Sequence, residues 1–340
     1  MTELKQLRVL RAVAEAGSFS AAAERLNYTQ PAVSRIVAAL ERELDAVLVE
    51  RECRPVRLTD AGDALVRHAE DVFAQLSSAR SEVEAISRAD GGSVSLGTFS
   101  SAGTSFVVDA LSQFRERHPA VRVTIVEAGM PSALVRRLRR GDLDVAVVFD
   151  YPAAGDDIGA GLEFHHLLDV PWDVVLPRDS RLARKARLRP ADLAHENWVL
   201  PDFGPESPSL KLIGRMCATE GFEPDVAFRV NDCHMNQALV AAGEGISLLP
   251  RLLLNPVHPG VAVRPLAGDT PTMRVAAVRV PTRFLAPATV EFLTVLKDAA
   301  KRRVDSWTAP GSPDSAATAA SGPPGRRSVC ERIRSSSRSS

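Results

Sequence analysis

The feature that most constrains the fold of this chain is a run of apolar residues spaced as heptads between residues 61 and 87. They recur at alternating intervals of four and three, at Leu65, Ala69, Val72, Leu76, Ala79, Val83 and Ile86. This spacing is typical of one long helix with a single apolar seam. The segment cannot bury such a seam by itself, so the pattern favours pairing with a second copy. A helix packed on its own chain is the alternative.

The segment before the heptads, residues 17–44, has the pattern of two helices joined by a tight turn. Ser18 or Ser20 is placed to cap the first helix and Thr29 the second, because a side-chain oxygen there accepts from an unpaired backbone N–H. Pro31 is tolerated in a first turn, where its missing N–H has no partner to lose. In the second helix a buried stripe recurs at three-four spacing, at Val33, Ile36, Val37, Leu40 and Leu44.

The other face of this second helix carries Gln30, Pro31, Ser34 and Arg35. Side chains one turn apart project from the same side of a helix. Hydrogen-bonding tips near a helix N-terminus, among small residues, suit the base edges of a DNA major groove. An ordinary amphipathic hairpin with a solvated polar face explains the periodicity equally well.

Residues 51–59 follow a short apolar run and predict a two-stranded wing that turns around Arg54-Pro55. Arg51, Arg54 and Arg57 cluster in it. Guanidinium groups on such a wing are suited to phosphates or to the minor groove. A solubilising charged turn is the alternative.

Composition excludes several classes of function. Among the 340 residues, 42 Lys and Arg balance 42 Asp and Glu, so any attraction to phosphate must come from local clusters of charge. The four cysteines lack metal-type spacing, no apolar run has the length of a membrane span, and no signal peptide is evident. No nucleophile elbow or phosphate-binding loop is present. We therefore expect a cytoplasmic protein that is not an enzyme, with no metal, cofactor or membrane partner.

The second half of the chain alternates between strand and helix patterns. Strands are predicted at 94–97, 121–126 and 143–149, with helices at 106–117 and 131–140 between them, which indicates a parallel α/β sheet. Further strands are predicted at 162–168, 172–176, 198–200, 227–230, 246–250, 261–266 and 273–280, with helices at 209–220, 235–242 and 286–302. The last segment, 304–340, is rich in Ser, Ala, Pro, Gly and Arg, and we expect it to be disordered.

Ligands of open α/β sheets bind beyond the carboxyl ends of the strands. That rule selects the following candidate residues: Ser100, Ser101, Gly129, Met130, Phe149, Pro201, Asp202, Phe203 and Asn231. The Ser100-Ser101 pair precedes a predicted helix and suits a carboxylate or another anion. Plain helix capping is the alternative for each serine.

Fixed residues at fixed spacing then add a resemblance. Five motifs of the first 62 residues are similar to the DNA-binding signature of LysR-type transcriptional regulators. They are Ser18-Phe19-Ser20-x-Ala22-Ala23-x-x-Leu26, Thr29-Gln30-Pro31-Ala32-Val33-Ser34, Leu40-Glu41, Leu48-x-x-Arg51 and Leu58-Thr59-x-Ala61-Gly62. Asp45 and Val49 depart from it, where the family usually has Gly and Phe. Three motifs of the second half resemble the effector domain of the same family: Phe114-x-x-x-x-Pro119, Gly141-Asp142-Leu143-Asp144-Val145-Ala146 and Ala242-Gly243-x-Gly245-Ile246-x-x-Leu249-Pro250.

The resemblance implies an α/β protein with three parts. These are a winged helix-turn-helix domain (1–60), a linker and dimerisation helix (61–90), and an effector domain of periplasmic-binding-protein type (91–303). The effector domain divides into subdomain I, about 91–161 and 267–303, and subdomain II, about 162–266. The implied partners are double-stranded promoter DNA, a small-molecule effector and a second copy, as a dimer or a dimer of dimers.

The implied mechanism is that an effector closes the cleft between the subdomains, repositions the paired helical hairpins on an interrupted palindrome and changes the bending of the DNA. The alternative is a regulator of the same architecture that senses redox state through Cys217 or Cys233. Buried inert thiols are the simpler expectation for both, because a reactive thiol needs access and a lowered pKa.

Overall fold

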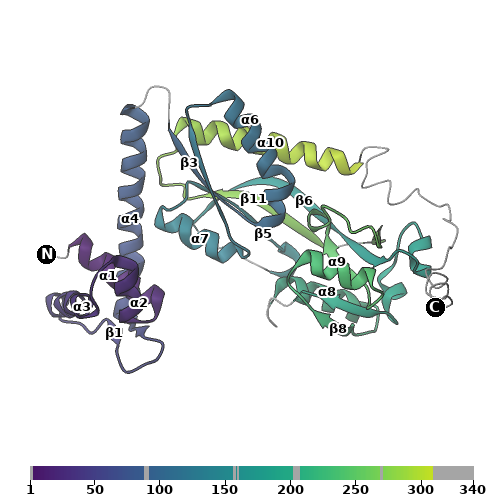
Figure 1. The fold of residues 1–340 in the computed structure, drawn as a ribbon, viewed down its shortest axis with the longest axis horizontal. Helices are drawn as coiled ribbons and strands as arrows, with labels where there is room; N and C mark the ends of the chain where they lie inside the picture. Colours follow the sequence, from purple (N-terminus) through teal and green to yellow (C-terminus); the bar gives the residue numbers. More distant parts are fainter. Residues whose placement is uncertain are drawn as a thin grey trace, which may run out of the picture.

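The computed structural model describes residues 3–87, 92–155, 158, 161–201, 207–268 and 271–308. An N-terminal domain lies at one end of a long helix, and a larger α/β half lies to the side of that helix (Figure 1). Residues 88–91, at the predicted end of the linker helix, the candidate residues Asp202 and Phe203, and residues 309–340 lie outside the described part.

The N-terminal domain comprises α1 (Leu4–Ala16), α2 (Phe19–Leu26), α3 (Gln30–Leu44) and a small hairpin of β1 (Val49–Glu50) and β2 (Arg57–Leu58). The stripe expected on the second helix of the 17–44 pair is wrong for Leu44, which lies in the last turn of α3 and is 40% exposed. Its other positions are on the buried face, and Val33, Val37 and Leu40 are fully covered. These side chains pack against Leu10 of α1 in one apolar cluster. The paired helices and the wing are confirmed.

Helix α4 (Asp60–Ser87) is the predicted long helix, but its apolar seam divides between two environments. Leu65 packs into the N-terminal core and Ala69 is buried. Val72, Leu76 and Val83 are 41%, 43% and 61% exposed. We call Val72, Leu76, Ala79 and Val83 the exposed stripe of α4; the side chain of Ile86 lies outside the description. The first seam positions are therefore satisfied within the chain, and only the later ones remain open to a second copy.

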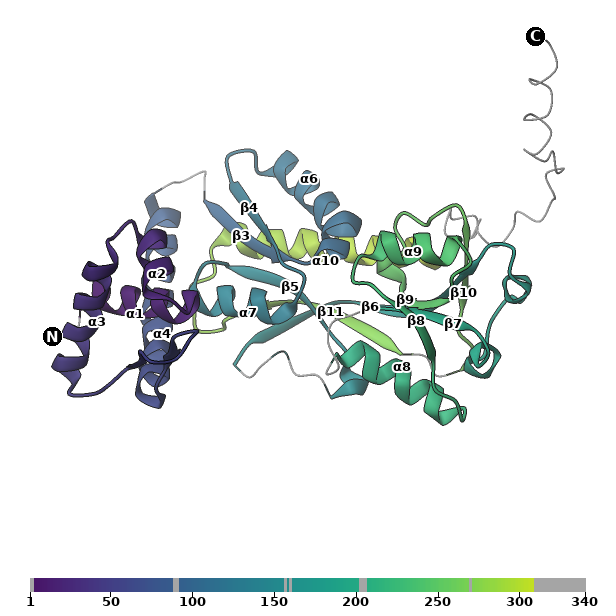
Figure 2. The same cartoon turned by 60° about the horizontal axis from the view of Figure 1, so that its bottom comes forward.

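Subdomain I is a sheet with helices on both faces (Figures 1 and 2). Its elements are β3 (Ser93–Thr98), α5 (Ser100–Ala102), the π-turn η1 (Gly103–Val107), α6 (Val108–Arg117), β4 (Arg122–Glu127), α7 (Pro131–Arg140), β5 (Val145–Asp150), η2 (Pro152–Ala154), β11 (Thr272–Arg279) and α10 (Pro287–Thr308). Alternate β5 residues belong to different clusters: Val145 and Val147 lie in the core with α6 and α10, and Ala146 and Val148 pack on α7. A continuous apolar run is what a strand buried on both faces requires.

The prediction of a parallel sheet is correct for three strands and incomplete for the rest. β3 pairs in parallel with β4 and β5, whereas β11 pairs antiparallel with β5 and with β6 (Glu163–Pro177). The two strands expected at 162–168 and 172–176 are this single strand β6, because Pro171 sits opposite Thr272 at the end of the β11 ladder and costs the sheet little. The first part of β6 therefore belongs to subdomain I and its last part to subdomain II.

Subdomain II pairs that last part of β6 with β9 (Ser247–Pro250) and β10 (Val261–Pro265). Its other elements are η3 (Arg181–Arg184), η4 (Pro190–Leu193), β7 (Asn197–Leu200), α8 (Pro208–Thr219), β8 (Asp225–Arg229), α9 (Cys233–Ala241) and η5 (Arg251–Leu253). β7 and β8 form a parallel pair. Helix α10 of subdomain I continues to Thr308, and Trp307 packs on the main core. The expectation of disorder from residue 304 is therefore wrong for residues 304–308.

Candidate functional site

Helix α3 presents a polar face at its N-terminal end. Gln30, Pro31 and Arg35 are exposed and Ser34 is half-buried, on the side opposite the covered stripe. The Nε of Arg35 donates to the carbonyl oxygen of Pro31 at 3.3 Å, so its guanidinium lies along the first turn. The four predicted side chains thus lie together, and this face can offer hydrogen-bond donors and acceptors to the edge of a base.

Ser18 and Thr29 both occupy the predicted N-cap positions, but only Ser18 makes a capping hydrogen bond. Ser18 is the N-cap of α2, and its Oγ accepts from the backbone N–H of Ala21 at 3.5 Å. Thr29 is the N-cap of α3, but its side chain makes no capping hydrogen bond and is exposed. The Thr29 hydroxyl therefore remains available at the start of the polar face.

Arg51 is attached to α3, although its side chain is 41% exposed. Its guanidinium donates to Ser34 Oγ at 3.3 Å and to Glu41 Oε2 at 2.8 Å, and it lies 5.3 Å from the ring centre of Phe19. The other Glu41 oxygen accepts from the backbone N–H of Leu48 at 3.0 Å. This network fixes the base of the wing against α3, so Arg51 orients the polar face. No local pattern indicates this role, because Glu41 lies in α3 and Arg51 lies in the wing.

Arg54 and Arg57 are both exposed on the wing. The wing is also attached to the turn between α1 and α2, where the backbone N–H of Val56 donates to the carbonyl of Gly17 at 2.9 Å. A Cβ on Gly17 would lie 3.0 Å from Pro55. Arg54 and Arg57 are therefore exposed on a loop that is held by Arg51 at its base and by Val56 at Gly17.

The candidate effector residues of subdomain I come together at one edge of the sheet. Ser100 and Ser101 follow β3, Gly129 and Met130 follow the neighbouring β4, and the ring of Phe149 lies 4.9 Å from that of Phe99. No capping hydrogen bond is made at the start of α5, and Ser101 is 9% exposed. Helix capping therefore does not account for the serine pair. Helix α5 also contacts η5, so this edge adjoins subdomain II.

Pro201 and Asn231 come together in subdomain II. Val230 donates its backbone N–H to the carbonyl of Leu200 at 2.9 Å, which places the ends of β7 and β8 side by side. Asn231 is exposed and Pro201 is half-buried.

A cavity of about 690 Å³ lies at a different place between the subdomains. Its wall is formed by residues of several elements, among them Pro152 and Ala153 of η2, Leu212, Met216 and Thr219 of α8, and Arg274 of β11. The candidate residues that the structure describes lie at the strand ends and do not line this cavity. Its volume is in the range of small-molecule sites.

Arg274 joins this cavity to a buried carboxylate that sequence reasoning missed. Its Nε donates to Asp150 Oδ1 at 2.9 Å, and the Asp150 side chain is 2% exposed. The hydrogen bond to Asp150 raises the pKa of Arg274, so the guanidinium keeps its charge. A second buried carboxylate, that of Asp173, accepts from Arg251 at 2.6 and 2.7 Å and fixes η5 to β6. In each pair the two residues are far apart in sequence, and no local pattern indicates them.

The described cysteines are poor nucleophiles. Cys217 is fully buried, and burial raises the pKa of its thiol to about 11. Burial also raises the pKa of Cys233, and a hydrogen bond with Glu50 raises that of Cys53. All three are free thiols. A high thiol pKa leaves little thiolate at neutral pH.

Neither a membrane-spanning helix nor a metal-binding cluster is found among the described residues. No helix there is both long and apolar enough to cross a membrane. No group of three or more His, Cys, Asp or Glu side chains is arranged there to hold a metal ion.

Comparison with known proteins covers both halves of the chain. Residues 4–63 match the family described as bacterial regulatory helix-turn-helix protein, lysR family, and residues 87–301 match the LysR substrate binding domain. The chain is 30% identical over 282 residues to the uncharacterised HTH-type transcriptional regulator YvbU of Bacillus subtilis, which covers 82% of this chain and 92% of YvbU. It is 29% identical over 271 residues to the Hca operon transcriptional activator HcaR of Escherichia coli, covering 80% and 89%.

Solved structures agree in fold. Full-length OxyR from Pseudomonas aeruginosa superposes with a TM-score of 0.63 at 25% identity, over 88% of this chain and 95% of OxyR. CbnR in complex with its target DNA gives a TM-score of 0.59 at 24% identity, over 88% of this chain and all of that chain.

Proposed function

Because the chain belongs to the LysR family of transcriptional regulators, with a DNA-binding helix-turn-helix domain and an effector-binding domain, we propose how its residues serve these tasks. It binds, as a dimer or a dimer of dimers, an interrupted palindrome in promoter DNA. A small molecule bound between subdomains I and II changes the arrangement of its N-terminal domains, and with it transcription.

The observation that carries the DNA-binding proposal is the polar face of α3 beside the wing. Gln30, Ser34 and Arg35 are directed to base edges in the major groove, with Ser18, Thr29 and Pro31 at the approach. Arg54 and Arg57 bind phosphates or the minor groove, and Arg51 orients the face through Glu41 and Ser34. Base contacts carry specificity, and phosphate contacts carry affinity that depends on salt.

The exposed stripe of α4 supports the two-fold part of the proposal. Val72, Leu76 and Val83 leave a continuous apolar strip in water along a helix whose other side is covered. Pairing with the same strip of a second chain buries it, and a two-fold dimer reads two related half-sites.

The effector has two candidate places. One is the set of strand ends with Ser100, Ser101, Gly129, Met130, Phe149, Pro201 and Asn231, to which Asp202 and Phe203 belong by sequence. The other is the cavity beside Met216 and Arg274. A thermal-shift screen of metabolites finds the ligand, and two variants then separate the places. Gly129→Trp, at a position with open space around it, abolishes the shift only for the strand ends. Thr219→Trp abolishes it only for the cavity.

The redox alternative assigns sensing to Cys217 or Cys233, and a structural relative supports it more than these two thiols do. An OxyR mutant of Corynebacterium glutamicum, solved with bound hydrogen peroxide, gives a TM-score of 0.54 at 25% identity. In this chain the raised pKa values of Cys217 and Cys233 disfavour oxidation. A shift in melting temperature with peroxide, and none with metabolites, would reverse this preference.

Two arginine variants test the DNA-binding proposal, with fluorescence anisotropy against the promoter site and a scrambled site. Arg35→Ala is expected to lose about 1–3 kcal/mol of discrimination between the two sites. Arg54→Ala weakens binding to both and reduces the salt slope by about 1. Arg117→Ala, an exposed charge at the end of α6, is the control. If the wild-type protein shows no salt-dependent preference for the promoter site, the DNA-binding proposal is wrong.

A further inference from the structure

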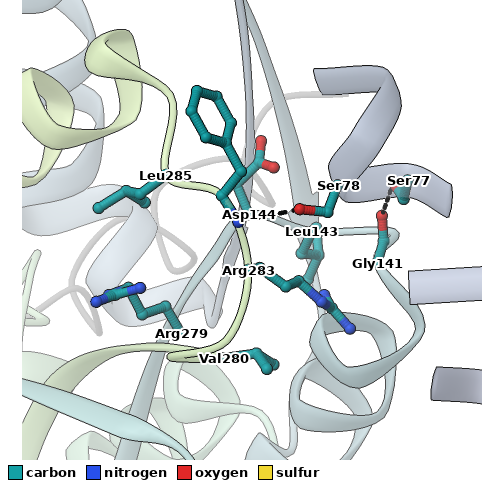
Figure 3. A pocket seen from close by; sticks show the side chains of 10 residues that line it. Ser77, Ser78, Gly141, Leu143, Asp144, Arg279, Val280, Arg283 and Leu285 are labelled. Atoms are coloured by element: carbon teal, nitrogen blue, oxygen red, sulfur yellow. Dashed lines mark hydrogen bonds between the residues drawn. The ribbon is translucent and has the colours of Figure 1, made fainter. Parts of the chain in front are cut away.

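The middle of α4 lies on subdomain I through contacts that are almost entirely polar. Glu70 Oε1 accepts from Arg140 Nε at 2.9 Å, Ser77 Oγ donates to the carbonyl of Gly141 at 2.8 Å, and Ser78 Oγ accepts from the backbone N–H of Phe284 at 3.0 Å. Figure 3 shows Ser77 beside Gly141 and Ser78 at the segment that follows β11. We call this set of contacts the α4 junction.

Arg140 extends the junction to a third part of the chain. Besides Glu70, its guanidinium contacts Glu15 Oε1 of α1 at 2.7 Å. The side chains of Arg140, Glu15 and Glu70 are 19%, 19% and 23% exposed. Glu15 also contacts Arg25 of α2 at 2.7 Å. One guanidinium at the end of α7 therefore connects subdomain I to the N-terminal domain and to α4 at the same time.

Backbone geometry brings the two surfaces unusually close. Gly141 has a positive φ of 80°, and a Cβ at this position would lie 2.9 Å from Ser77 Cβ and 3.2 Å from Ala74 Cα. Two features therefore require glycine at this position: its positive φ and the close approach of α4. Arg283, on the same side, donates to the carbonyls of Leu138 and Arg139 at the end of α7.

The α4 junction buries little apolar surface, so α4 can separate from subdomain I at low cost in free energy. Ala74 is its only fully buried apolar residue among those described on this stretch of α4, and a cavity of about 20 Å³ remains between α4 and residues 279–285. That space is about the size of one water molecule. Ion pairs that are partly exposed contribute little each and weaken with salt. The exposed stripe is on another side of α4, so the junction leaves it free for a second chain.

We propose that the α4 junction is an intrachain docking surface whose occupant is the chain's own N-terminal domain with α4, and that Arg140 holds this unit in one orientation on subdomain I. Release of Arg140 from Glu15 and Glu70 lets the N-terminal domain take other orientations. The proposal goes beyond the proposed function, because it needs neither an effector nor a particular DNA site.

Hydrogen exchange of the full-length protein tests the proposal at the amide of Phe284, which reports the junction because its N–H is bonded to Ser78. Arg140→Ala is expected to speed this exchange about fivefold and to leave the amides of β5 unchanged. Raising NaCl from ~50 mM to ~500 mM has the same effect on the wild-type protein and almost none on the variant. Arg137→Ala, exposed one turn earlier on α7, is the matched control.

A charge exchange separates docking from simple loss of stability. Glu70→Arg and Arg140→Glu each speed the exchange of Phe284, and the double variant slows it again toward the wild-type rate. X-ray scattering follows the same order, with a larger maximum dimension for the single variants. An unchanged rate in Arg140→Ala, an equal effect of Arg137→Ala, or no recovery in the double variant overturns the proposal. These readouts need no DNA, so failure of DNA binding leaves them intact.

Discussion

Helix α4 is attached to its own chain at two places, and the two attachments differ in chemistry. Its first turns carry Leu65 and Val66 into the apolar core of the N-terminal domain. Its middle turns meet subdomain I through Glu70, Ser77 and Ser78. Apolar burial is strong and insensitive to salt, whereas partly exposed polar contacts are weak and sensitive to it. The N-terminal domain and α4 therefore behave as one body, and the adjustable joint lies between that body and subdomain I.

The largest expected effect breaks the apolar attachment. Leu10 is fully buried in the cluster that includes Leu65. Leu10→Ala leaves a cavity there and is expected to cost about 3 kcal/mol in the free energy of unfolding of the N-terminal domain. Urea denaturation monitored by circular dichroism measures this, and DNA binding is lost in parallel. A cost below about 1 kcal/mol would show that this attachment is no firmer than the polar one.

A second variant tests the side of α4 that neither attachment uses. Leu76→Glu places a charge in the exposed stripe and is expected to weaken the proposed dimer by about 2 kcal/mol, roughly 30-fold in its dissociation constant. Light scattering on the eluting protein measures the mass. The unfolding of the separate chain changes by less than about 0.5 kcal/mol, because the position is open in a single chain. Unchanged mass at every concentration would contradict pairing through this stripe.

Gly141→Ala disturbs the polar joint without removing a charge. The added Cβ meets Ser77 and Ala74, and alanine tolerates the positive φ poorly, so we expect about 1–2 kcal/mol of destabilisation. Exchange at Phe284 speeds up, while the amides of α3 keep their protection. Gly155→Ala, which has a similar positive φ and open space around it, controls for backbone strain alone. Equal behaviour of the two variants would mean that the close approach of α4 contributes nothing.

The smallest effect concerns Asp144, which faces the cavity of the junction. Burial raises the pKa of its carboxyl above 3.8, although its Oδ2 accepts from the backbone N–H of Ser95 at 2.7 Å. Because the folded state holds the proton more tightly, this contribution to stability is full below pH 3.8 and is lost as pH rises through the raised pKa. Asp144→Asn keeps an acceptor and removes this pH dependence, with a change below about 1 kcal/mol at pH 7. Melting temperatures from pH 4 to 7 measure it; an unchanged slope contradicts the assignment.

Local patterns predicted local structure well. The apolar run Val145–Val148 is a strand buried on both faces, and the helix before it spans Pro131–Arg140, as expected, with Gly141 as its C-cap. Asp45, where related sequences usually have Gly, is the left-handed C-cap of α3 with a φ of 49°, a conformation that Asp tolerates better than most residues.

Contacts between distant segments were not predictable. The contacts of Arg51 with Glu41 and Ser34 depend on the fold, and the partners of Arg140 lie on two other helices. The cavity beside Arg274 likewise depends on η2, α8 and β11 meeting, which no window of sequence encodes. Periodicity reports which face of an element is buried, and it is silent on which charged groups face each other across two elements.

The pairing of β11 with β5 and β6 has a consequence for how the protein is made. The sheet of subdomain I can be completed only after Arg274 has been synthesised, 124 residues after its partner Asp150. The apolar core of the N-terminal domain is built from residues between Val9 and Val66, so this domain can fold while the rest of the chain is still being synthesised. At about 5–20 residues per second, the interval from the end of α4 to the end of β11 lasts on the order of 10–40 s. If the proposed dimer pairs through the exposed stripe of α4, two chains growing on one messenger can therefore pair before either has a finished effector half.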